Sequence, residues 1–332
     1  MPRKTLIFGN GLGMALDHRH FSLTNAMADV WNSPTALSAT QKALISRCLG
    51  GNESVPQFEA QLDPLYQVTS ACRMLAHLNM SQGMNVHWLS PEGREFPLAV
   101  GNYIHKVATR LHQFDRSLPR TFVTPLINFV RSSKSHIATL NYDKLLYEAF
   151  LDSDLMLPNY RDTILVDGML PRGFSKAALA RHSNNDFGYY LHLHGSPLFF
   201  DDENGQILKR PRHDLNMLTT QDSNHIVLTH VNHKISVIAA SLALSTYWEY
   251  LSRCLNESTH IIVFGYSGDD THLNELISIH AQSKPILVIE WNGTNYTQAH
   301  RHTYWREKLK ARTLSLMHME NILDFTQWDL HA

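Results

Sequence analysis

Two histidines alternate along the apolar stretch "YYLHLHGSPLF" (residues 189–199), and a Gly-Ser-Pro turn follows the second one. The stretch predicts a strand, on which His192 and His194 would share one face because their positions are two apart. Imidazoles transfer protons near neutral pH, so they suit acid-base catalysis. Gly195 at the end of the strand permits a bend or the close approach of another segment. The stretch is therefore either a core strand or the rim of an active site, with His194 nearer to the turn.

Glycines follow an apolar run at the start of the chain, "KTLIFGNGLG". Gly9, Asn10 and Gly11 come directly after the predicted strand, where backbone N–H groups can approach a diphosphate. The pattern matches neither Gly-x-Gly-x-x-Gly nor a Walker loop. Phosphate binding and a plain tight turn are equally good interpretations of these glycines.

A later run, "IIVFGYSGDD", ends in a second turn of small residues that contains Gly265 and Ser267. It resembles a nucleophile elbow but lacks the Gly-x-Ser-x-Gly spacing, and His194 precedes Ser267, contrary to the order in α/β hydrolases. A turn that contacts a ribose or a phosphate fits better. Asp269 or Asp270 is expected to cap the helix that follows, since aspartate is a favoured N-cap residue.

Asn141 and Asp143 stand in "ATLNYDKLLYEA", between a predicted strand and a predicted helix. Asparagine and aspartate cap helices well, which is the simplest explanation for them. Two polar groups are more than one cap needs, so contact with a ligand is an equal alternative.

Histidine is abundant, with 21 residues, and three His-x-His pairs occur: His18/His20, His192/His194 and His300/His302. None of the pairs has the His-Glu-x-x-His spacing or a pair of cysteines nearby. We therefore expect no metal site.

These turns need a scaffold that brings them together. Strand-turn-helix units recur along the chain, which predicts a single α/β domain over residues 1–332 with a doubly wound, Rossmann-like parallel sheet. In such sheets ligands bind beyond the carboxyl ends of the strands, so the four turns should meet along one edge. Apolar residues at helical spacing predict a mainly helical insertion over residues 35–132. Residues 151–188 are expected to form a loop-rich insertion, and residues 226–258 are expected to be mostly one long helix.

The composition excludes several classes of protein. The 332 residues are 43% hydrophobic and carry a formal net charge of −1, so there is no basic field for nucleic acid. The three cysteines are widely separated and make neither a disulfide framework nor a Cys-x-x-Cys metal site, which fits a reducing cytoplasm. No apolar stretch reaches about 18 residues, the rough minimum for a membrane span. We expect a cytoplasmic protein with no membrane contact and no direct nucleic-acid binding.

Taken together and in this order, the turns resemble the sirtuin-like NAD-consuming fold. "GNGLG" stands where sirtuins carry a Gly-Ala-Gly dinucleotide loop, and "TLNYD" is similar to their Thr-Gln-Asn-Ile-Asp motif. "LHGS" resembles the catalytic His-Gly, and "FGYSGDD" resembles the later Gly-Thr/Ser-Ser ribose loop. "VPQFEAQL" (residues 55–62), with Phe58-Glu59, is similar to a segment of the bacterial sirtuin-like proteins of antiphage defence.

The resemblance implies an activity. Sirtuin deacylases hold zinc through two Cys-x-x-Cys pairs, and this sequence has no such pair. The defence relatives instead cleave NAD+ to ADP-ribose and nicotinamide, with NAD+ as a substrate and no other cofactor. They act as oligomers, sometimes docked on a HerA-like ATPase. Alternatives to hydrolysis are a domain that senses NAD or ADP-ribose, and a subunit that docks on a partner.

The resemblance also implies roles for the residues of the turns. His194 would be the catalytic base, Asn141 would orient water or the ribose, and Asp143 would bind the ribose or the carboxamide. The diphosphate would lie on the first glycine turn and a ribose or phosphate on the last one. The predicted nucleotide-binding residues are Gly9, Asn10, Gly11, Gly265 and Ser267.

Overall fold

The computed structural model describes residues 1–51, 56, 58–81, 88–157, 162–182, 185–217, 223–228, 231–293 and 296–330. Their centre is a seven-stranded sheet in the order β11-β10-β9-β1-β2-β6-β3, in which every neighbouring pair is parallel. The strands are β1 (Lys4–Phe8), β2 (His136–Thr139), β3 (Leu165–Val166), β6 (Gly188–His192), β9 (His260–Phe264), β10 (Ile286–Trp291) and β11 (Leu314–Met319). The predicted α/β fold with a doubly wound parallel sheet is confirmed.

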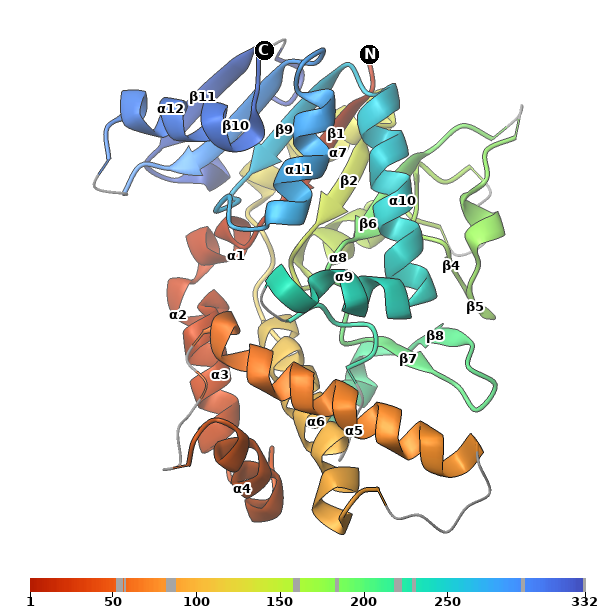
Figure 1. Ribbon diagram of the computed structural model, residues 1–332. Coiled ribbons are helices and arrows are strands. Elements are labelled where there is room, and N and C mark those ends of the chain that lie inside the picture. Colours follow the sequence, from red (N-terminus) through yellow and green to blue (C-terminus); the bar gives the residue numbers. More distant parts are fainter. Residues whose placement is uncertain are drawn as a thin grey trace.

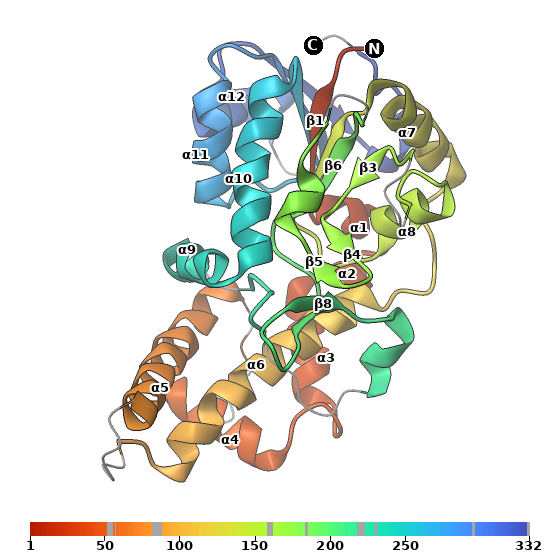
Figure 2. The same cartoon turned by 90° about the vertical axis from the view of Figure 1, so that its right-hand side faces the viewer.

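Helices cover both faces of this sheet, as Figure 2 shows with α7 and α8 on one side and α10 to α12 on the other. Alternate residues of β1 enter the two cores: Leu6 and Phe8 pack with α7 and α8, and Ile7 packs with α10 and α11. Burial on both faces explains why the strands read as unbroken apolar runs. The covering helices are α1 (Gly11–Leu16), α7 (Arg120–Ser133), α8 (Leu145–Asp152), α10 (Leu242–Glu257), α11 (Thr271–His280) and α12 (Gln298–Leu309).

A group of helices lies beyond the carboxyl ends of the strands, at the bottom of Figure 1, while both termini lie near the opposite end of the sheet. This group has its own core, in which Trp31 packs against Tyr103 and Leu65 is fully buried. Its elements are α3 (Leu23–Asn32), α4 (Ala39–Cys48), η1 (Glu59–Leu62), α5 (Asp63–Ser81) and α6 (Pro91–His112). The short α2 (His18–Phe21) leads into this group, and its Phe21 packs in the core between the sheet and α7. Within the range 35–132, α4, α5 and α6 belong to this group, whereas α7 packs on the sheet.

Short elements fill the remaining connections. Between α8 and β6 the structure has β3, the hairpin of β4 (Met169–Leu170) with β5 (Gly173–Phe174), and η2 (Lys176–Leu179). A second hairpin, β7 (Phe199–Asp201) with β8 (Ile207–Lys209), follows β6 and leads into η3 (Arg212–Met217). The chain ends with η4 (Ile322–Asp324) after β11. In the described part of the chain, no helix combines the length and apolar character needed to cross a membrane.

The expected long helix over residues 226–258 is wrong. The structure has two helices there, α9 (Val231–Ala240) and α10, separated at Ser241. The Ser241 hydroxyl accepts a hydrogen bond from the backbone N–H of Leu244, so it caps α10 and starts a new helix axis. Upstream, Ile226 forms a bridge with Gly195 and is not helical. Helical periodicity continues across such a break because it depends on side chains and not on the cap.

Gly195 confirms both expectations for a glycine at this point. Its φ of +80° lies in the left-handed region, which costs little for glycine alone. A Cβ atom built at position 195 would also overlap the carbonyl oxygen of His225. The backbone that enters α9 therefore packs directly on the turn that carries His194.

Gly195→Ala should destabilise the protein strongly. We expect the free energy of unfolding to fall by about 3 kcal/mol or more, because a left-handed backbone and a collision with a fixed carbonyl act together. Gly205→Ala is the matched control: φ is +73° there, but no atom lies within 4 Å of the added Cβ, so about 1 kcal/mol is expected. Urea denaturation of both variants measures this, and equal losses would contradict the close approach at Gly195.

Candidate active site

A cavity of about 850 Å³ opens beyond the carboxyl ends of the strands, between the sheet and the helices at the bottom of Figure 1. It lies where the chain turns in opposite directions from β1, toward β2 on one side and β9 on the other, which is the position where α/β sheets bind ligands. Its size is that of small-molecule and cofactor sites. The cavity is lined by all eight predicted site residues: Gly9, Asn10, Gly11, Asn141, Asp143, His194, Gly265 and Ser267. Their common location is observed; their roles stay predictions.

The two glycine turns pack directly on each other at the base of the cavity. The Gly9 N–H donates to the Phe264 carbonyl at 2.9 Å, and the Gly11 N–H donates to the Gly265 carbonyl at 2.7 Å. A Cβ on Gly11 would lie 2.6 Å from the same Gly265 oxygen. These two N–H groups are therefore engaged within the protein, and the glycines would serve a diphosphate mainly by leaving space for it.

Asn141 links the end of β2 to the first turn, because its Nδ2 donates to the Gly9 carbonyl at 3.1 Å. Its Oδ1 is buried and has no hydrogen-bond partner among the described residues. Buried amide oxygens are normally bonded, so this atom suits a ligand or a water. The structure does not support the interpretation of Asn141 as a helix cap, because its side chain makes no capping bond to α8, whose N-cap is Lys144.

Asp143 fits both interpretations, as a helix cap and as a residue that contacts a ligand. Its Oδ1 accepts from the backbone N–H of Leu145 at 3.0 Å, as a capping side chain would. Its Oδ2 is buried without a hydrogen-bond partner in the described part of the chain. Burial raises the pKa of this carboxyl to about 6. Asp143 can therefore gain or lose a proton close to neutral pH.

His194 is held by a buried carboxylate. Its Nε2 lies 3.0 Å from Oδ2 of Asp270, and the same oxygen accepts from Nζ of Lys234 at 3.0 Å. All three side chains are buried and line the cavity. Burial alone would raise the pKa of Asp270, but the hydrogen bonds from His194 and Lys234 hold it well below its usual range. The carboxylate can thereby fix the orientation and the tautomer of the His194 ring.

Asp270 was expected only as a helix cap, and that role is confirmed, since its Oδ1 accepts from the Leu273 N–H at the start of α11. Its second role, and Lys234 altogether, were not predicted. Lys234 comes from α9, and no motif in its surroundings signals a contact with a residue 36 positions away.

His192 and His194 do not work as a pair. Strand β6 ends at His192, and the chain turns there, with the Gly195 N–H donating to the His192 carbonyl. The two rings have different surroundings, because His194 lines the large cavity and His192 does not. His192 packs among aromatic rings, with its ring centre 4.9 Å from that of Tyr190 and 5.4 Å from that of Tyr147. It lines a second, smaller cavity.

The remaining walls come from segments with weaker sequence signals. Ser267 is exposed at the rim, where its Oγ accepts from the Asp269 N–H at 3.3 Å. Glu59 of η1 reaches the cavity from the helical group. It belongs to the segment 55–62, of which residues 55 and 57 lie outside the described part of the chain. Glu290, at the end of β10, is bound by Arg301 at 2.6 Å.

The sheet order, the paired glycine turns and the buried histidine define an α/β protein with a candidate ligand site at its switch point. A family model for the SIR2-like domain matches residues 135–310, which is more than half of the chain. The chain therefore belongs to the SIR2-like domain family. The matched region contains β2, β6, β9 and β10, and β1 completes the sheet between β2 and β9. No curated protein gives a significant match to the chain.

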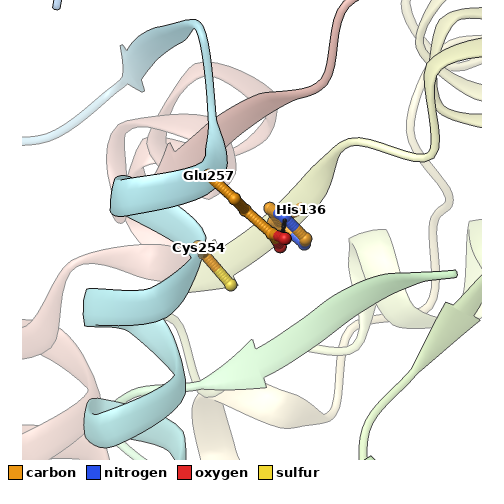
Figure 3. Close-up of side chains that lie close together, drawn as sticks. All are labelled: His136, Cys254 and Glu257. Carbon is orange, nitrogen blue, oxygen red and sulfur yellow. Dashed lines mark ion pairs between the residues drawn. The ribbon is translucent and has the colours of Figure 1, made fainter. Parts of the chain in front are cut away.

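Outside the cavity, His136, Cys254 and Glu257 form the one group in the described residues whose ligand atoms lie close enough for a metal ion (Figure 3). The His136 Nδ1 accepts from the Tyr189 N–H, which leaves the proton on Nε2, 2.5 Å from Glu257. Arg181 also binds Glu257, at 2.7 Å. Burial raises the pKa of the Cys254 thiol well above its usual value. A protonated thiol, a donating imidazole and a guanidinium all disfavour a metal cation.

This cluster makes stability depend on pH. Burial lowers the pKa of His136 to about 4, whereas the unfolded chain titrates near 6.5. Between these values the unfolded state binds one more proton, so stability is present above pH 6.5 and is lost as the pH falls toward 4. We expect His136 to account for about 2 kcal/mol of lost stability between pH 7.5 and pH 5.

His136→Gln, which has no titratable ring, should lose correspondingly less stability over the same interval. Urea denaturation of both proteins at the two pH values measures the difference. An identical pH dependence would show that His136 is not buried in its neutral form.

Proposed function

We propose that this protein hydrolyses NAD+ to ADP-ribose and nicotinamide. The observation that carries the proposal is the buried His194–Asp270 pair, placed in a cavity at the switch point of a SIR2-like domain. The family match supports use of NAD in general, and the residues in the cavity support hydrolysis in particular.

The reaction does not require a strong general acid in the site. A water oxygen forms a bond to C1′ of the ribose, and the C1′–N bond breaks with its electron pair leaving on the nitrogen of neutral nicotinamide. The proton of the water passes to the His194 imidazole and then to solvent, so the charges balance. Because the leaving group is neutral, a general base and a stabilised oxocarbenium-like transition state suffice.

The unpartnered atoms suit the other tasks. The buried Asn141 Oδ1 can accept from the attacking water or from a ribose hydroxyl. The buried Asp143 Oδ2 can accept from a ribose hydroxyl or from the carboxamide, and its negative form would offset the positive charge that develops on the ribose. The packed glycine turns leave room for the diphosphate at the base of the cavity.

We further propose that the activity serves bacterial antiphage defence by depleting NAD+, in a cytoplasmic homo-oligomer that can dock on a HerA-like ATPase. The support is the resemblance of the turns to the sirtuin-like defence proteins, together with the absence from the sequence of the two Cys-x-x-Cys pairs of the deacylases. Assembly into an oligomer, or docking on a partner, would also allow an activating signal to control the catalytic site.

Purified protein should release nicotinamide and ADP-ribose from NAD+. We expect His194→Ala to lower the rate about 10²- to 10⁴-fold through loss of the base, and Asn141→Ala to lower it about tenfold or more. Chromatography of the products and calorimetric binding of NAD+ measure this. A His194→Ala variant with the wild-type rate would sink the assignment. Binding of NAD+ without turnover would favour a sensor or an enzyme that awaits a partner.

Asp270→Asn should act on catalysis through His194. Asparagine still caps α11, but it removes the charge that fixes the imidazole, so kcat should fall about ten- to a hundredfold while KM changes little. Asp269→Asn is the control, since it removes a neighbouring exposed carboxylate. If both variants lose activity equally, or if the loss lies in KM alone, Asp270 does not position the base.

A further inference from the structure

A second cavity of about 250 Å³ lies behind Asp143, which lines both cavities. We call it the cationic cavity, after the basic and imidazole side chains in its wall: His112, Lys144, His192, Lys209, Arg210 and Arg212. The only carboxylates that its lining contributes, in the part of the chain that the structure describes, are Asp143 and Glu148. Burial lowers the pKa of both imidazoles, so the positive charge comes from the four lysine and arginine side chains. These outnumber the two carboxylates, so the cavity attracts negative charge.

Part of this charge is already neutralised. Glu148 pairs with Lys144 at 3.4 Å and also contacts Arg212. Lys209 lies 3.7 Å from Asp167, and its Nζ sits 3.5 Å from the centre of the Tyr147 ring. These contacts hold the basic groups in place without exhausting their donors, because lysine has three N–H donors and arginine has five.

Several polar atoms of the wall lack partners. Nε2 of His112 and Nε2 of His192 are buried and have no hydrogen-bond partner among the described residues, and the buried Nζ of Lys209 has its ion pair with Asp167 but no short hydrogen bond there. His112 and His192 are only 5% and 6% exposed. The His112 ring is fixed, because its Nδ1 donates to the Tyr142 carbonyl at 2.7 Å, which leaves Nε2 of the neutral ring as an acceptor, suited to an O–H group of the occupant. Buried polar atoms almost always have a partner, so these atoms indicate that a polar occupant belongs in the cavity.

We propose that the cationic cavity binds a small oxyanion, namely inorganic phosphate or the phosphoryl group of a small phosphorylated metabolite. Lysine and arginine are the usual partners of phosphate oxygens, and the same groups repel a metal ion. The volume is much larger than one water needs and smaller than typical pockets for drug-sized ligands. A phosphate with a small carrier suits it. The occupant would lie next to Asp143 and thus beside the larger cavity.

The test is isothermal titration calorimetry with inorganic phosphate and with ribose 5-phosphate, in the absence of NAD+. Wild-type protein should bind at least one of them. Lys209→Met should weaken binding about tenfold or more, through loss of a charged hydrogen bond. Lys234→Met is the matched variant in the larger cavity, and Lys176→Met removes an exposed lysine on the surface. Both should bind like the wild type.

Two further variants keep the test independent of folding defects at Lys209. Arg212→Met changes a half-exposed side chain, and His192→Phe keeps the ring contacts while it removes Nε2. Either should weaken binding, with circular dichroism confirming the fold. Tighter binding of ribose 5-phosphate than of phosphate would identify a phosphorylated metabolite, and equal affinity would identify the free ion.

Two results would overturn the proposal. One is the absence of binding of either probe to wild-type protein at millimolar concentration. The other is loss of binding in Lys234→Met with full binding in Lys209→Met, which would place the anion in the larger cavity. Because no NAD+ is present, neither result depends on the proposed hydrolysis.

Discussion

The carboxylate of Asp270 is the contact on which the site depends. One of its oxygens caps α11, and the other accepts from both His194 and Lys234. Its backbone is tied as well, because the Tyr266 hydroxyl bonds to both its N–H and its carbonyl. A buried charge is costly unless it is paired and hydrogen-bonded, so these partners must stay assembled. The Asp270 carboxylate thereby holds together the turn after β6, the start of α11 and helix α9.

The packing of the two glycine turns determines where the cavity lies. Gly11 and Gly265 bring the backbones after β1 and β9 into direct contact, and no larger residue at position 11 would permit this. Since β1 and β9 are neighbours at the point where the sheet changes direction, the contact closes the base of the site. Side chains from β2 and β6 then reach the cavity from the other side, and the separate helical group covers it.

The sequence allowed the sheet and the edge on which the turns meet to be predicted, because both depend on local patterns. Apolar runs that end in glycine or in polar residues mark the ends of buried parallel strands, as at Gly9 and Asn141. The contact of Lys234 with Asp270 could not be predicted, since a lysine on a helix carries no sign of its distant partner. The division of His192 and His194 between two cavities was not predicted, since it depends on segments distant in sequence that pack against the turn at Gly195. The break at Ser241 was hidden because a cap interrupts the helix without interrupting the apolar pattern.

The two ends of the sheet use ionic groups differently. At the amino ends of the strands, Glu257 joins His136 and Arg181, and each of these groups serves to hold neighbouring segments together. At the carboxyl ends, the ion pairs surround atoms that the described residues leave unpartnered, namely Asn141 Oδ1 and Asp143 Oδ2. A hydrophobic cluster could replace a buried ion pair at little cost in stability, so stability alone does not explain the Lys234–Asp270–His194 group. Its geometry is explained if the charge has a task, which is to hold one imidazole steady beside polar atoms that await a ligand.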